Sequence, residues 1–197
     1  MRVGVLGGTF DPVHIGHVLL AQSVQEQLAL DQVLFVPAAD PPHREADPPQ
    51  AAAEDRLAMV ERAIADSPCF LVSRIELDRP GKSYTVDTLT AIGAERAGDK
   101  LFLIIGADNV SQLSTWHKPE AILELCTIVA GSRVTDSLTL DTPLTQQLQL
   151  VDTPLIQLSS TLIRERIRAG RSIRYTVPTS VEAYIAERGL YAHQTRK

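Results

Sequence analysis

Residues 1–20 read MRVGVLGGTFDPVHIGHVLL: a short apolar run, two adjacent glycines, and then a segment with helical spacing. Val3–Leu6 predicts a buried strand, while Gly7 and Gly8 can bring the backbone close to a ligand and adopt positive φ without steric cost. The helix that follows points its free N–H groups and the positive end of its dipole at the same turn. Strand, turn and helix together predict a binding site for an anion such as phosphate.

Two histidines stand at the start of this predicted helix. The helix is expected to begin near residue 13 or 14. Asp11 is its plausible N-cap, and Pro12 then supplies a proline at the first helical position. His14 and His17 are three residues apart and therefore occupy neighbouring positions on one helix face. With an ordinary pKa of about 6.5, both could donate hydrogen bonds or carry charge toward phosphate oxygens. The alternative is a capped helix start with one partly buried histidine.

Further along the chain, short apolar runs alternate with helical patterns. The runs at residues 33–37, 70–72, 101–106, 127–131 and 154–158 read as further buried strands. Helices are expected to start near residues 55, 85, 119, 160 and 180. This alternation predicts an α/β fold: one Rossmann-like, doubly wound parallel sheet with helices on both faces, in a single domain over residues 1–197. Ligands are then expected at the carboxyl ends of the strands.

Two stretches interrupt this alternation. Residues 38–55 hold four prolines and many small or charged residues, so we expect a loop there that could act as a lid. Residues 133–152 are polar and weakly patterned, and no element is predicted for them. Residues 158–190 are expected to form a helical C-terminal part.

The composition narrows the class of protein. The net charge of −5 over 197 residues gives no basic field for nucleic acid, so a nucleic-acid partner is not expected. No run approaches the roughly 18 apolar residues of a membrane span, and the N-terminal residues do not resemble a signal peptide. We therefore expect a cytoplasmic protein without a membrane partner. Cys69 and Cys126 lie in apolar settings that suit buried thiols.

A second candidate phosphate site follows the run at 154–158. Ser159, Ser160 and Thr161 precede a predicted helix and offer hydroxyl groups beside its free N–H groups. Arg164 adds positive charge one turn later. The alternative is an exposed charged helix face in which Arg164, Arg168 and Arg171 pair with Glu165. Two helix N-termini, one near each end of the chain, could converge on one polyphosphate.

A zinc site is disfavoured for the paired histidines. The spacing H-E-x-x-H is absent, because the residues here are H-I-G-H, and no third ligand lies close in the sequence.

These motifs resemble the nucleotidyltransferase superfamily that carries H-x-G-H and S-S-T-x-I-R, and within it bacterial nicotinate-nucleotide adenylyltransferases. The segments that match are GGTFDPVHIGH at 7–17, PPHR at 41–44 with Arg for the usual Lys, SYTVDTL at 83–89, IGAD at 105–108, Trp116, and LSSTLIR at 158–164 with Leu for Ile. The resemblance implies transfer of the adenylyl group of ATP to nicotinate mononucleotide, which gives deamido-NAD and pyrophosphate in NAD biosynthesis. Mg²⁺ would be carried mainly by the ATP phosphates, without a protein metal site.

The resemblance also implies roles for individual residues. The residues expected to act in catalysis are His14, His17 and Arg164. His14 and His17 would contact the phosphates around the reacting phosphorus, and Arg164 would help to hold the β and γ phosphates as pyrophosphate leaves. Those expected to bind ATP are Gly7, Gly8, Thr9, Phe10, Gly106, Asp108, Ser159, Ser160 and Thr161. Those expected to bind nicotinate mononucleotide are Ser83, Tyr84, Thr85, Trp116, His43 and Arg44. A homo-oligomer is compatible with the sequence.

Alternatives stay open for the acceptor side and for the function. Trp116 could be a buried core residue, residues 83–85 could serve only to cap a helix, and residues 43 and 44 could lie in an inert exposed loop. Another nucleotidyltransferase, with nicotinamide mononucleotide or phosphopantetheine as its acceptor, is the nearest alternative function. A non-catalytic adenine-nucleotide sensor is the alternative from a different class.

Overall fold

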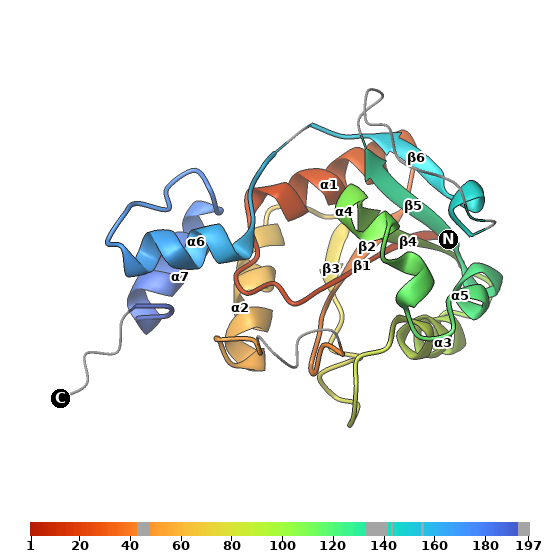
Figure 1. The fold of residues 1–197 in the computed structure, drawn as a ribbon, viewed down its shortest axis with the longest axis horizontal. Helices are drawn as coiled ribbons and strands as arrows, with labels where there is room; N and C mark the ends of the chain where they lie inside the picture. The colour runs from red at the N-terminus through yellow and green to blue at the C-terminus, as the bar shows by residue number, and fades with distance from the viewer. Residues whose placement is uncertain (43–47, 133–141, 143, 155, 193–197) are drawn as a thin grey trace.

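A six-stranded parallel sheet forms the centre of the computed structural model, which describes residues 1–42, 48–132, 142, 144–154 and 156–192 (Figure 1). The strands are β1 (Arg2–Gly8), β2 (Gln32–Pro37), β3 (Phe70–Val72), β4 (Lys100–Gly106), β5 (Thr127–Ser132) and β6 (Gln149–Asp152). Their order is β3-β2-β1-β4-β5-β6, and every neighbouring pair is parallel. The strand order reverses between β1 and β4, which confirms the predicted doubly wound α/β fold.

Helices cover both faces of this sheet. They are α1 (Ile15–Gln27), α2 (Ala53–Ile64), α3 (Thr85–Glu95), α4 (Ala107–Val110), α5 (Pro119–Leu125), α6 (Ser160–Arg168) and α7 (Thr179–Arg188). α6 and α7 form the predicted helical C-terminal part, which lies at one end of the molecule next to α2 (Figure 1). Short 3-10 turns lie at Leu113–Thr115 and Thr145–Gln147.

The hydrophobic core has two layers, because successive residues of a strand face opposite sides of the sheet. In β2, Val33 and Phe35 belong to the layer under α1, α2, α6 and α7. Leu34 and Val36 belong to the layer under α3 and α5. A strand buried on both faces reads as a continuous apolar run, which is why β1, β2, β4 and β5 could be predicted from the sequence.

The sixth strand is where the prediction is wrong. The run at 154–158 was expected to form it, but β6 is Gln149–Asp152, inside the stretch for which no element was predicted. β6 is an edge strand paired only with β5, and of its four residues only Val151 is buried. It therefore lacks the apolar run that marks a central strand. The apolar run that misled the prediction has Ile156 exposed and leads into α6.

Candidate active site

A cavity of about 980 Å³ lies at the carboxyl edge of the sheet. Its walls come from the ends of β1 and β4, the first turn of α1, and the segments that begin α3 and α6. In open α/β sheets, ligands bind in the crevice outside the point where the strand order reverses, and here that point lies between β1 and β4. Motifs from both ends of the chain therefore border one site.

His14 and His17 are joined at the start of α1. The helix begins at Ile15 with His14 as its N-cap, so the prediction of Asp11 as the cap was wrong. The backbone N–H of His14 donates to Nδ1 of His17 at 3.1 Å, and the two rings stack with centroids 3.6 Å apart. Phe10 meets the His17 ring edge-on at 5.0 Å. Because Nδ1 of His17 accepts a bond, the neutral ring carries its proton on Nε2.

The pKa values of both histidines are lowered in this arrangement. Burial lowers the pKa of His14 to about 4. Burial and, secondarily, the neighbouring His14 lower the pKa of His17 well below its ordinary value. The ordinary pKa assumed from the sequence was therefore wrong. A neutral imidazole can still donate a hydrogen bond through its ring N–H group.

Glycines at two positions, Gly8 and Gly16, make room for aromatic rings beside the cavity. Gly7 and Gly8 end β1 and both line the cavity, but the positive φ expected there is found at Phe10, with a φ of 49°. A Cβ on Gly8 would lie 3.0 Å from the Phe10 ring. Gly16, which was not singled out from the sequence, is needed for a similar reason, since its Cβ would lie 3.1 Å from the His14 ring. Thr9 borders the cavity, whereas Phe10 is buried behind it and does not.

The start of α6 forms the opposite wall. Ser159, Ser160 and Thr161 all line the cavity. Ser159 is the N-cap, and its Oγ accepts the N–H of Leu162 at 3.1 Å. The hydroxyl of Ser160 donates to the carbonyl of Pro12 at 2.8 Å, although the two residues are 148 positions apart. The N-terminal ends of α1 and α6 are thus held side by side, as the sequence predicted for a polyphosphate site.

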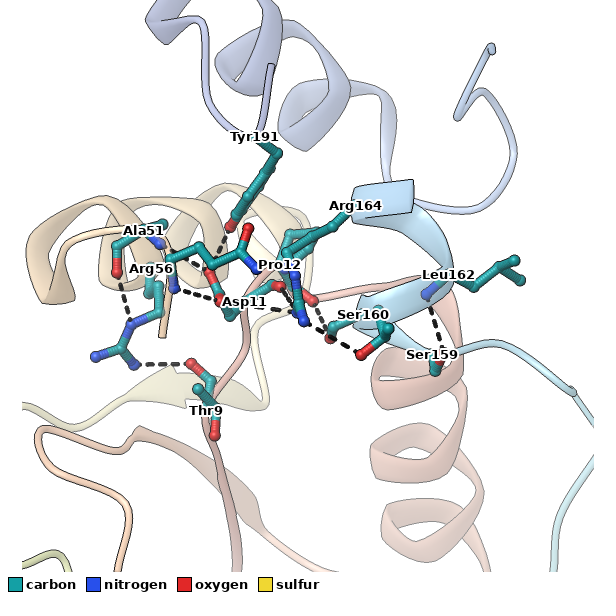
Figure 2. A network of polar contacts seen from close by, with 12 residues as sticks. Thr9, Asp11, Pro12, Ala51, Arg56, Ser159, Ser160, Leu162, Arg164 and Tyr191 are labelled. Atoms are coloured by element: carbon teal, nitrogen blue, oxygen red, sulfur yellow. Dashed lines mark hydrogen bonds and ion pairs between the residues drawn. The ribbon is translucent and has the colours of Figure 1, made fainter. Parts of the chain in front are cut away.

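Arg164 does not border this cavity. Its side chain is buried, and Nη1 donates to the carbonyl of Asp11 at 2.8 Å while Nη2 donates to the hydroxyl of Thr161 at 3.2 Å (Figure 2). The same guanidinium lies 3.7 Å from the Asp11 carboxylate. The predicted direct contact with phosphate is therefore not supported by its position. Arg164 instead connects α6 to the loop between β1 and α1.

The end of β4 supplies a third wall. Gly106 and Asp108 both line the cavity, as expected for residues that hold an ATP ribose. Gly106 is the N-cap of the short helix α4, and a Cβ on it would collide with the Asp108 carboxylate. The absence of a side chain at Gly106 thus lets this carboxylate fold back over the strand end.

The residues expected at the acceptor side also meet at the cavity. Ser83, Tyr84, Thr85 and Trp116 all line it. Thr85 begins α3, and Tyr84 is its N-cap. Trp116 is partly buried against the core layer under α3 and α5, so it serves the core and the cavity together.

Two further cavity residues on this side were missed from the sequence. The His117 ring lies 4.4 Å from the Tyr84 ring. Glu76 is buried, accepts the hydroxyl of Thr88 at 2.6 Å, and has its pKa raised by burial. Neither belongs to a pattern with a chemical meaning of its own, so no signal in the sequence pointed to them.

Hydrogen bonds hold both described ends of the loop at residues 38–55. The Ser83 hydroxyl accepts the N–H groups of Ala39 and Asp40, and the Asp11 carboxylate accepts those of Gln50 and Ala51. His43 and Arg44, the expected acceptor contacts in this loop, lie outside the described residues. The lid therefore stays a prediction.

Comparison with known proteins agrees with this geometry. The model of the cytidylyltransferase-like family matches residues 5–166. The chain belongs to this family. A relative from Thermus thermophilus, described as a probable nicotinate-nucleotide adenylyltransferase, is 49% identical over 97% of this chain and 100% of its own. A relative from Halalkalibacterium halodurans with the same description is 45% identical over 100% of this chain and 94% of its own.

Solved structures share the fold of this cytidylyltransferase-like protein. A nicotinic acid mononucleotide adenylyltransferase of Plasmodium falciparum, solved in complex with NaAD, superimposes with a TM-score of 0.76 over 96% of this chain and 97% of that one, at 16% identity. A structure described as a putative nicotinate-nucleotide adenylyltransferase of Vibrio parahaemolyticus gives a TM-score of 0.67 at 22% identity, over 97% and 96% of the two chains. At these identities the likeness concerns the fold.

Two negative findings apply to the part of this cytidylyltransferase-like chain that the structure describes. No three His, Cys, Asp or Glu side chains are grouped there so that they could hold a metal ion. None of the described helices has both the length and the apolar character needed to cross a membrane.

Proposed function

We propose that this protein transfers the adenylyl group of ATP to nicotinate mononucleotide, with release of pyrophosphate and formation of deamido-NAD. The observation that carries the proposal is the shared cavity, which joins the two candidate phosphate ends to the segments around Ser83 and Trp116. Relatives that share 41–49% of their residues with nearly the whole chain are described as probable nicotinate-nucleotide adenylyltransferases. The product places the reaction in NAD biosynthesis, and we expect it in the cytoplasm.

The chemistry needs charge stabilisation more than proton transfer. A phosphate oxygen of nicotinate mononucleotide attacks the α-phosphorus of ATP, and the bond between that phosphorus and the oxygen bridging it to the β-phosphate breaks. The attacking phosphate is already ionised, so no general base is required, and catalysis rests on positioning and on donors aimed at the developing charge. This requirement fits two neighbouring imidazoles at the cavity wall, whose pKa values are both lowered, better than a covalent nucleophile.

We assign the ATP phosphates to the two helix starts. His14 and His17 donate to oxygens around the α-phosphorus, with Gly7, Gly8 and Thr9 lining the same wall. The turn at Ser159, Ser160 and Thr161 receives the β- and γ-phosphates that leave as pyrophosphate. Gly106 and Asp108 hold the ribose. No direct phosphate contact is assigned to Arg164 or Phe10.

We assign nicotinate mononucleotide to the α3 side. Trp116 can stack on the nicotinate ring, and Ser83, Tyr84 and Thr85 line the wall beside it. The N–H groups of Ser83 and Tyr84 already donate to backbone carbonyls, so the nicotinate carboxylate can accept from those of the first turn of α3, which begins at Thr85. Mg²⁺ fits this site only as an ion held mainly by the ATP phosphates and water, where it would neutralise phosphate charge. A homo-oligomer stays a prediction from the sequence.

Pyrophosphate release from ATP, measured in parallel with nicotinate mononucleotide, nicotinamide mononucleotide and phosphopantetheine, tests the reaction and the acceptor together. We expect a value of kcat/KM for the acid that exceeds that for the amide by at least about tenfold, because a carboxylate receives N–H groups that an amide nitrogen cannot. Comparable values for acid and amide would contradict the acceptor. No release with any of the three would contradict the reaction.

A further inference from the structure

A buried polar network lies behind the loop that connects β1 to α1 (Figure 2). Three carbonyl oxygens of this loop accept bonds from side chains of other elements: Thr9 from Arg56 Nη1 at 2.7 Å, Asp11 from Arg164 Nη1 at 2.8 Å, and Pro12 from Ser160 Oγ at 2.8 Å. The loop belongs to no helix or strand, so bonds of this kind fix its path. It ends at His14, and the wall of the cavity depends on that path.

Arg56 belongs to this network, and the proposed reaction gives it no role. It lies in the first turns of α2, is 1% exposed, and does not line the cavity. Its Nε donates to the carbonyl of Ala51 at 3.3 Å, and its Nη1 to that of Thr9. One guanidinium thus joins the start of α2 to the end of β1.

The charge on Arg56 is unusual for so buried a position. Burial lowers its pKa, while Asp11, Tyr191 and Glu76 act in the opposite direction. Burying a charge is costly, and an apolar side chain of similar volume is often as stabilising or more so. Asp11 lies behind the phosphate wall of the cavity, and Glu76 borders its acceptor side. The cost of burying this charge is offset by these groups and by the two hydrogen bonds that Arg56 donates to the carbonyls of Ala51 and Thr9.

We propose that Arg56 is a positioning residue for adenylyl transfer, which fixes the carbonyl of Thr9 and thereby the path from Thr9 to His14. The inference rests on the proposed function. If Thr9 shifts, the backbone N–H of His14 shifts with the loop and weakens its bond to Nδ1 of His17. A misplacement of about 1 Å at a reacting group can cost about 100-fold in rate, so the effect appears in kcat more than in KM.

The decisive variants are Arg56→Lys and Arg56→Ala. Lys keeps the charge but cannot donate to two carbonyls from a planar fork, and Ala removes the group. For Arg56→Lys we expect kcat for pyrophosphate release to fall at least about tenfold, with KM for ATP within about threefold of the unchanged protein. For Arg56→Ala we expect added ethylguanidinium to restore part of kcat. A merely structural role would lower the melting temperature but leave kcat of the folded protein unchanged.

Arg62→Lys is the matched control. Arg62 lies on the same helix and also donates to a carbonyl, that of Ala58 at 3.0 Å, but it packs over Tyr184 away from the cavity. We expect its kcat to stay within about twofold. Hydrogen exchange measured by mass spectrometry adds a readout that needs no substrate. In Arg56→Lys, the peptide over residues 7–14 should exchange faster, while the peptide over α5 should not change.

These experiments distinguish a failure of the positioning role from a failure of the proposed function. Normal kcat and unchanged exchange at residues 7–14 in Arg56→Lys would overturn the positioning role. A loss of kcat matched by Arg62→Lys would overturn it as well. If the unchanged protein releases no pyrophosphate with any acceptor, the proposed function fails, whereas the exchange comparison still decides whether Arg56 fixes the loop.

Discussion

His17 has one structural role and one proposed catalytic role, and each involves a different ring nitrogen. Nδ1 accepts the N–H of His14, which completes the start of α1, and Nε2 is left as the donor on a ring that lines the cavity. His17→Ala removes both, so we expect kcat for pyrophosphate release to fall about 100-fold and the free energy of unfolding to fall by about 1 kcal/mol. His17→Asn should restore stability, because its amide oxygen can accept the same N–H, but not kcat. A folded His17→Ala with near-normal kcat would contradict the donor role.

The buried His14 makes stability depend on pH. Its pKa in the folded protein is about 4, below the unfolded value of about 6.5, so the unfolded chain binds more protons between these values. The stabilisation is fully present above pH 6.5 and is lost as the pH falls toward 4, by up to about 3 kcal/mol. In His14→Asn, whose side chain still suits an N-cap, the free energy of unfolding in urea should fall less between pH 7 and 5. His117→Asn is the control, since His117 is exposed, and an equal reduction there would contradict the assignment.

The start of α6 holds a helix cap and is the proposed site for the β- and γ-phosphates, and substitutions at Ser159 can separate these two functions. Ser159→Ala loses the bond from Leu162 N–H, so we expect the free energy of unfolding to fall by about 1 kcal/mol. Ser159→Asp keeps the cap but adds negative charge at the cavity wall, so stability should be retained while KM for ATP rises severalfold. Urea unfolding and initial rates measure the two effects. An unchanged KM in Ser159→Asp would show that phosphate does not approach this turn.

At the scale of elements, the sequence predicted the helices and strands that depend on local residue patterns. It missed the features that depend on contacts between residues far apart in the chain. The sequence alone could place the strands that are buried on both faces. It could also place the helices that begin with a cap residue and end at a glycine. The start of α1 could not, because Asp11 reads as a normal N-cap followed by Pro, yet its carboxylate accepts the N–H groups of Gln50 and Ala51. Arg164 was predicted to contact phosphate, with an exposed charged helix face as the alternative, but the fold buries it against the same loop. Neither contact produces a periodic pattern or a characteristic residue spacing in the sequence.

At the scale of the whole molecule, the C-terminal helical part and the sheet are expected to unfold together. Ile163 of α6 and Val181 of α7 belong to the same core layer as Phe10 and Val33. Polar contacts join the same parts: the Tyr191 hydroxyl donates to the Asp11 carboxylate at 2.8 Å, and that of Ser180 donates to the Arg62 carbonyl at 2.9 Å. A layer shared in this way leaves no boundary at which residues 158–190 could separate as a domain of their own.

Tyr191→Phe tests this coupling. The change removes one donor to the buried Asp11 carboxylate and should lower the free energy of unfolding by about 2 kcal/mol. Trp116 is the only tryptophan and packs in the other core layer, so its fluorescence reports on the far side of the sheet. In one cooperative unit, urea midpoints from Trp116 fluorescence and far-UV circular dichroism shift equally. Tyr175→Phe, at an 81% exposed ring, should shift neither. If Tyr191→Phe moves the dichroism midpoint but not the fluorescence midpoint, the C-terminal helices unfold separately and cannot hold the α6 wall of the cavity in place.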